Sequence, residues 1–184
     1  MFSIKEIFKE SLGFLIFASI LSLTAGILLR NIQDRLLVIL PLIIVLPALN
    51  GMIGNFGIIM TSRITTALYE KKVTGGFHSR IIKHLFREMI PISIFSALFI
   101  SVLSILIANF RGFDFNPVIL WKITLITLTT TISLVFLVFT VSIFGSLYVY
   151  KRRIDPDDVL IPITTSIADL GSMAIFSLLV AVLF

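Results

Sequence analysis

The stretch VLIPITTSIADLGSMAIFSLLVAVLF, residues 159–184, decides the fold class of this chain. It exceeds the roughly 20 apolar residues that a helix needs to cross a bilayer core. Asp169 is its only charged residue. A carboxylate in a membrane span costs a few kcal/mol at least, so it usually faces a bundle interior or a water-filled cavity. Because no Lys or Arg lies at a matching depth, the stretch predicts a membrane helix whose carboxylate meets a cation.

The composition of the whole chain supports a membrane location. Hydrophobic residues make up 58% of the 184, charged residues make up 14%, and the mean hydropathy is +1.11. Soluble domains carry about a quarter charged residues. The chain has no cysteine, which excludes disulfides and cysteine-ligated metals. We expect that the chain is not an enzyme. An intramembrane aspartyl protease needs two adjacent carboxylates, and the spans carry only one. A serine hydrolase would need a base within a span, whereas His78 and His84 lie between spans.

Five apolar segments are long enough to span a membrane. They cover residues 11–29, 36–61, 89–110, 118–149 and 159–184. Each must be helical, because an open sheet leaves backbone groups unsatisfied in lipid. The sequence therefore predicts an all-α, multi-pass protein of the cell membrane, with residues 1–184 forming a single transmembrane domain.

The basic residues are unevenly divided between the connectors. Of the 15 Lys and Arg residues, only Arg30, Arg35, Arg111 and Lys122 fall on one side of the predicted bundle. The positive-inside rule then places the N-terminus in the cytoplasm and the C-terminus outside.

The connector at residues 73–90 shows a helical pattern of its own. One face is apolar and the others are basic, which indicates an amphipathic helix lying on the inner leaflet. The apolar face holds Phe77, Ile81, Leu85 and Met89, and the polar residues are Arg80, Lys83, His84 and Arg87. The first ten residues, with Phe2, Ile4, Ile7 and Phe8, suggest a second and shorter surface helix. We expect both to contact membrane lipids.

The second apolar segment is unusual in its middle, where it reads LPALNGMIGNFG over residues 46–57. Proline removes a backbone donor and glycine permits unwinding. One interpretation is a broken helix whose free carbonyls coordinate ions. The other is close helix packing by the glycines, with Asn50 and Asn55 as interhelical hydrogen-bond donors. The sequence leaves both open.

Depth connects this segment with Asp169. At about 1.5 Å per residue, Asp169 lies roughly 16 Å from Asp158 at the cytoplasmic edge. Asn50 and Asn55 lie roughly 20 Å and 12 Å from Arg63, so they bracket the same depth. Steps of four and three residues place Thr165 and Ser172 on the face of Asp169. This polar stripe favours a hydrated cation path.

Three further acidic residues precede the last span. Asp155, Asp157 and Asp158 can concentrate cations at the mouth of the path, or they can cap the helix N-terminus. The two roles are compatible. We also assign Ser62, near the cytoplasmic end of the second segment, to the entrance.

Two motifs carry a family resemblance. Residues 47–56, PALNGMIGNF, followed by SRITT at 62–66, resemble the second-helix signature of the MgtE magnesium-transporter family, and more closely its eukaryotic solute-carrier branch. Residues 155–169, DPDDVLIPITTSIAD, resemble the fifth-helix signature. Five spans with a cytoplasmic N-terminus match the family's membrane domain.

The resemblance implies transport of divalent cations, chiefly Mg²⁺, through a pore on a two-fold axis lined by the second and fifth helices. The acid that binds the hydrated ion falls on Asp169, the Gly-Asn pair on Gly54 and Asn55, and the residue one turn before the acid on Thr165. The chain departs from bacterial members because only ten residues precede the first span, so no cytoplasmic sensor domain is expected. The chain has one five-helix unit where the solute carriers have two, so we expect two copies to form a homodimer. We expect no nucleic-acid partner.

The sequence leaves alternatives open for the transported ion and for the function. Oxygen ligands suit Mg²⁺, which dehydrates reluctantly and keeps several waters, but Mn²⁺, other divalent ions or Na⁺ could use the same architecture. A membrane assembly subunit that does not transport, in which Asp169 only packs against a partner helix, is the other alternative.

Overall fold

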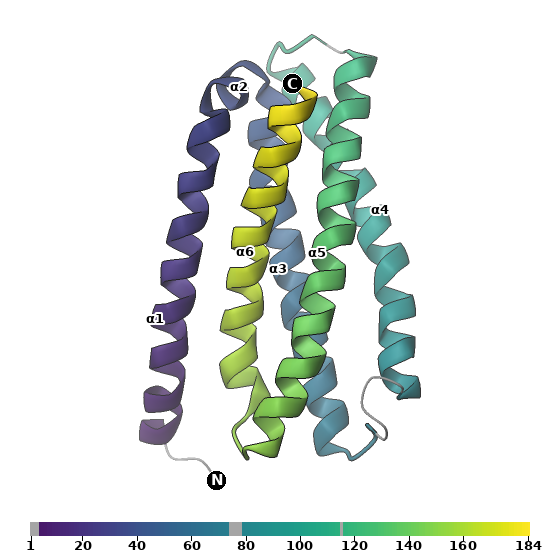
Figure 1. Ribbon diagram of the computed structural model, residues 1–184. Helices are drawn as coiled ribbons and strands as arrows, with labels where there is room; N and C mark the ends of the chain where they lie inside the picture. The colour runs from purple at the N-terminus through teal and green to yellow at the C-terminus, as the bar shows by residue number, and fades with distance from the viewer. Residues whose placement is uncertain (1–3, 74–78, 115) are drawn as a thin grey trace.

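The computed structural model describes residues 4–73, 79–114 and 116–184, and all its regular structure in these ranges is helical (Figure 1). The elements are α1 (Ile4–Leu29), a 3₁₀ turn (Arg30–Ile32), α2 (Gln33–Val38), α3 (Leu40–Tyr69), α4 (Arg80–Phe110), α5 (Pro117–Lys151) and α6 (Pro156–Leu183).

Five helical segments in the described ranges are long and apolar enough to cross a membrane, which confirms the predicted number of spans. They cover Leu12–Val38, Leu40–Tyr69, Arg80–Phe110, Pro117–Lys151 and Pro156–Leu183. Several helices extend beyond the apolar segments into polar sequence, because a helix does not have to end where the apolar run ends. The first described helix starts at one end of the bundle and the C-terminus lies at the other (Figure 1). Which end faces the cytoplasm stays a prediction.

The helix that carries Asp169 packs against three other helices. α6 contacts α1, α3 and α5, whereas α1 lies at the edge and packs mainly against α6 (Figure 1). α4 closes the opposite side against α3 and α5. The middle of α6 is therefore surrounded by protein on three sides, which positions its polar residues against α1 and α3.

The second span is not broken in its middle. α3 is one α-helix from Leu40 to Tyr69 with Pro47 inside it, so the interpretation as unwound backbone is wrong. The chain instead breaks before α3, at Ile39 (φ −105°, ψ 83°), and Pro41 lies in the first turn, where its missing N–H costs nothing. At Gly57, an added Cβ would lie 3.3 Å from the Thr164 side chain. This glycine therefore allows α3 and α6 to approach closely, as the packing interpretation predicted.

The predicted surface helix at residues 73–90 is not a separate element. Residues from Arg80 onward form the first turns of α4, so the third span starts well before residue 89. Leu85 and Met89 are buried against residues of α3 and α5, so the amphipathic pattern reflects packing on protein. Phe77 lies outside the described residues. The sequence alone did not distinguish the two cases, because the same apolar helix face forms whether the helix packs on lipid or on a protein core.

The N-terminal surface helix is corrected in the same way. Residues from Ile4 onward are continuous with α1, which runs to Leu29 without interruption. Phe2 lies outside the described residues. The contact of this segment with lipid stays a prediction.

Two basic side chains hold the C-terminal end of α6. The last carbonyls of a helix have no partner within it. Arg35 Nη1 from α2 donates to the carbonyls of Val180 (2.8 Å) and Ala181 (2.6 Å). Lys122 Nζ from α5 donates to the Leu183 carbonyl and lies 4.7 Å from the centre of the Phe184 ring. Positive charge at a helix C-terminus is also favourable for the helix dipole.

We expect Arg35→Gln to destabilise the bundle by about 1.5–3 kcal/mol, because hydrogen bonds to a charged group contribute that much and α6 would lose a cap. Thermal unfolding of the purified protein in detergent measures this as a lower Tm. Arg30→Gln is the matched control, since Arg30 is exposed on the preceding turn. Equal Tm values for the two variants would contradict the capping role.

Candidate cation site

Asp169 is held by hydrogen bonds from two other helices. Ser22 Oγ on α1 donates to Asp169 Oδ2 at 2.8 Å, and Asn50 Nδ2 on α3 donates to Asp169 Oδ1 at 2.7 Å. Asp169 is half-buried and lines a groove between α1 and α6. These two donors fix the plane of the carboxylate oxygens. No basic side chain takes part in these contacts.

Ser172 completes the cluster from the next turn of α6. Its hydroxyl lies within hydrogen-bond reach of Asn50 Oδ1 and, at 3.0 Å, of the Asp169 carbonyl. Ser172 is fully buried. Asn50 therefore donates to the carboxylate through its nitrogen and meets a hydroxyl through its oxygen. Ser172 therefore supports Asn50, and its role in the path itself stays a prediction.

The carboxylate opens onto a groove between α1 and α6. The residues that line this groove are Leu15, Ala18, Ser19, Ser22, Leu23, Pro162, Thr165, Ser166 and Asp169. The mixture of hydroxyls and one carboxylate follows from the three- and four-residue spacing on α6, which repeats on one helix face. The groove therefore combines apolar side chains with the oxygen atoms of one carboxylate and several hydroxyls.

Thr165 lies in this groove one turn before Asp169, as the sequence predicted. Its hydroxyl donates back to its own helix, at 2.9 Å from the Ile161 carbonyl and 3.0 Å from the Pro162 carbonyl. This arrangement consumes the donor and leaves the oxygen lone pairs for another partner. Thr165 can therefore accept a hydrogen bond from a water molecule of a hydrated cation.

Asn55 does not join Asp169 within the chain. It is exposed and lines a different groove, between α3 and α4, together with Gly51 and Phe99. The reason is helical geometry, because five residues turn a helix by about 140° from Asn50. Gly54, four residues from Asn50, stays near the same face, and an added Cβ there would meet nothing within 4 Å. Asn50 and Asn55 therefore lie at similar depths to Asp169, but only Asn50 contacts it.

The acidic residues at the start of α6 include its N-cap. Asp155 is the N-cap, and its Oδ1 accepts from the Asp157 backbone N–H at 3.0 Å. Asp157 and Asp158 lie in the first turn, where negative charge is favourable for the helix dipole. The capping role is therefore observed for Asp155, and the concentration of cations by the three carboxylates stays a prediction.

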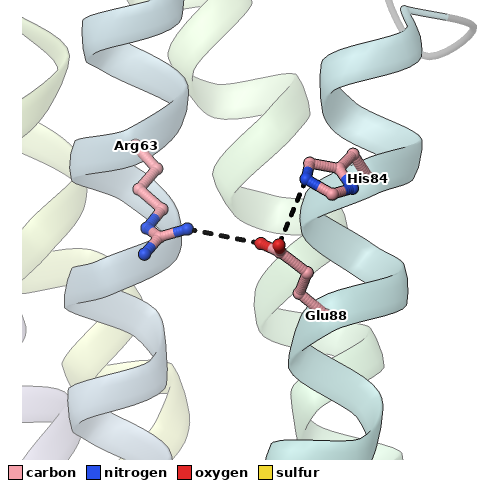
Figure 2. A network of polar contacts seen from close by, with 3 residues as sticks. All are labelled: Arg63, His84 and Glu88. Atoms are coloured by element: carbon pink, nitrogen blue, oxygen red, sulfur yellow. Dashed lines mark hydrogen bonds and ion pairs between the residues drawn. The ribbon is translucent and has the colours of Figure 1, made fainter.

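Ser62 lies further along α3 than Asn50, in a third groove. It is half-buried and shares this groove with Thr66 of α3 and Ile81 of α4. Its neighbour Arg63 joins α3 to α4 through Glu88, at 3.5 Å between Nη1 and Oε2. His84 Nε2 lies 3.1 Å from the other Glu88 oxygen (Figure 2). These side chains are substantially exposed, so the contact adds little stability. An entrance role for Ser62 stays a prediction.

Ser22 is the site residue that the sequence analysis missed. It lies on α1, which the two recognised motifs do not include. A signal was present, because Ala18, Ser22 and Ala25 are small residues spaced four and three apart. Such a stripe indicates a close helix contact.

The described residues contain no group of three or more His, Cys, Asp or Glu side chains that could hold a metal ion. Direct binding of a metal ion by three or more such side chains is therefore not found in this part of the chain. The cluster instead offers one carboxylate with amide and hydroxyl oxygens, which suits a cation that keeps its hydration shell.

Comparison with known proteins supplies a family. The family model MgtE, described as a divalent cation transporter, matches residues 46–179, which include α4, α5, most of α3 and most of α6. No curated protein and no solved structure matches the chain.

Proposed function

Because this chain belongs to the MgtE family of divalent cation transporters, we propose that it carries Mg²⁺ across the membrane as a homodimer, along a path lined by α3 and α6. The family consists of transporters rather than enzymes, and the five spans make the chain a multi-pass membrane protein. In the proposal, Asp169 binds the ion through its water shell.

One observation carries the proposal. Asp169 is a half-buried carboxylate at membrane depth, fixed by Ser22 and Asn50, and it lines a groove with the hydroxyl of Thr165. Ionisable residues inside membranes mark ion pathways by default. Since Mg²⁺ sheds its water reluctantly, a carboxylate that contacts the water shell can select the ion without dehydrating it.

The open face of α3 supports a homodimer. An added Cβ would meet nothing within 4 Å at Gly51 or Gly54, and Asn55 is exposed on the same helix. Small and polar residues that face outward in a membrane helix are typical of helix–helix interfaces. A two-fold partner on this face would give Asn55 a place at the interface.

The specific alternative is an assembly subunit without transport, in which the Ser22 and Asn50 contacts only hold helices together. Uptake of Mg²⁺ into liposomes that contain the purified protein tests the proposal directly. We expect uptake above protein-free liposomes, and repetition with an imposed Na⁺ gradient separates an exchanger from a channel. No uptake in either condition would contradict Mg²⁺ transport.

Binding gives a second test. We expect Mg²⁺ to raise the Tm of the purified protein, because a ligand present at 100 times its Kd stabilises the folded state by about 2.7 kcal/mol. Thermal unfolding at increasing Mg²⁺, with Na⁺ at matched ionic strength as control, measures the shift. A wild-type Tm that does not respond to Mg²⁺ would favour the assembly subunit.

A further inference from the structure

α1 presents a stripe of small residues to α6, and its middle member contacts the candidate ion-binding carboxylate. Ala18 and Ala25 are buried, with exposed fractions of 6% and 2%. Ser22 lies between them on the same helix face and donates to Asp169 Oδ2 at 2.8 Å. The helix outside the family match, which begins at residue 46, thus reaches the centre of the site.

We propose that Ser22 is a positioning residue for Asp169, and that α1 therefore forms a third wall of the Mg²⁺ path beside α3 and α6. This inference rests on the proposed function, because it assigns Ser22 a role in ion binding at the same carboxylate. It goes beyond that function by adding an element that neither recognised motif contains.

The physical argument starts from the carboxylate's acceptor capacity. An ionised carboxylate offers about four lone-pair positions. Ser22 occupies one on Oδ2 and Asn50 occupies one on Oδ1, so the plane of the group is fixed from both sides. The remaining positions are free to face the groove, where Ser19 and Thr165 also lie. A hydrated cation in that groove then meets a carboxylate that is already oriented.

Loss of such an orienting group is measurable. Hydrogen bonds that orient metal-binding residues typically change metal affinity by about 10–100-fold when they are removed. Because the ion here would be held through water, we expect the lower end of this range. Ser22 should affect ion binding more than the rate of passage once the ion is bound.

A packing role must be separated from this positioning role, and the same helix pair provides the control. Ser177 Oγ on α6 donates to the Leu28 carbonyl on α1 at 3.0 Å. It joins the same two helices two turns beyond Asp169, and this hydrogen bond does not involve the carboxylate. Ser177→Ala therefore removes helix–helix hydrogen bonding and leaves the orientation of Asp169 unchanged.

The experiment compares wild type with Ser22→Ala, Ser22→Thr and Ser177→Ala in liposomes, and measures the apparent KM for Mg²⁺ and the maximal uptake rate. We expect Ser22→Ala to raise the KM by about tenfold with a smaller change in maximal rate. Ser22→Thr keeps the hydroxyl, and its added methyl can lie toward the groove, so its KM should return to within about threefold of wild type. Ser177→Ala should leave the KM unchanged.

Two outcomes would overturn the inference. An unchanged KM in Ser22→Ala would show that the hydroxyl does not orient the carboxylate for the ion. An equal rise in KM for Ser22→Ala and Ser177→Ala would show that only helix packing matters. Either result, obtained with a wild-type protein that transports Mg²⁺, would leave the proposed function intact. Absence of wild-type uptake would instead reject the proposed function itself.

Discussion

Replacing Asp169 by asparagine should lower Mg²⁺ uptake by about a hundredfold or more. Coulomb's law with an effective dielectric constant of about 20 gives roughly 6.6 kcal/mol for a divalent ion about 5 Å from one carboxylate. If hydration offsets half of this attraction, about 3 kcal/mol remains, which is roughly a hundredfold in binding. Uptake into liposomes, measured beside wild type at equal protein content, tests the expectation.

The Asp169→Asn variant retains the size of the side chain but has one acceptor oxygen for the two donors, Ser22 and Asn50. A Tm measurement must therefore show that the variant is folded. Asp169→Glu keeps the charge and should retain more uptake than Asp169→Asn even though its oxygens are displaced. Asp34→Asn, at an exposed position on α2, controls for the loss of one carboxylate. Wild-type uptake in a folded Asp169→Asn protein would exclude Asp169 from the path.

The features of the fold that depend on composition could be predicted from the sequence. Five spans follow from the lengths of the apolar segments, and the structure has five helical segments of that kind among its described residues. The approach of Asn50 to Asp169 was anticipated from depth, because both lie near the middle of a span. The capping role of Asp155 was predicted from its place before a helix start, and the structure shows the capping hydrogen bond.

The features that depend on which helix faces which could not be predicted. Asn55 matched Asp169 in depth, but rotation about α3 directs it to the groove beside α4. The amphipathic pattern after residue 80 is the same for lipid and for protein contact, and only the packing against α3 and α5 distinguishes them. Ser22 was missed because a single serine on α1 gains significance only once α1 is known to pack against α6. In each case the missing information is the rotation of a helix about its own axis, which decides which neighbouring helix each residue faces.

The second large effect concerns the dimer. We expect Gly54→Trp to abolish dimer formation and uptake together, because the added side chain would occupy the face of α3 on which the partner is proposed to pack. Within one chain, a Cβ at Gly54 meets nothing within 4 Å, so the substitution should leave the bundle folded. Overpacking a helix contact costs about 1–3 kcal/mol, and each 1.4 kcal/mol weakens association tenfold. Two copies of the indole on a two-fold axis would at least double this cost.

Gly26 on α1 provides the matched control, because it is exposed and an added Cβ there also meets nothing within 4 Å. Gly26→Trp should leave both the dimer and uptake unchanged. The chain has no cysteine, so Gly54→Cys and Gly26→Cys each introduce a unique thiol. A dimer on the α3 face predicts disulfide-linked dimers for Gly54→Cys and far fewer for Gly26→Cys. Uptake at the wild-type rate by Gly54→Trp, with no crosslinking through Gly54→Cys, would place the interface elsewhere or make the single chain the transporting unit.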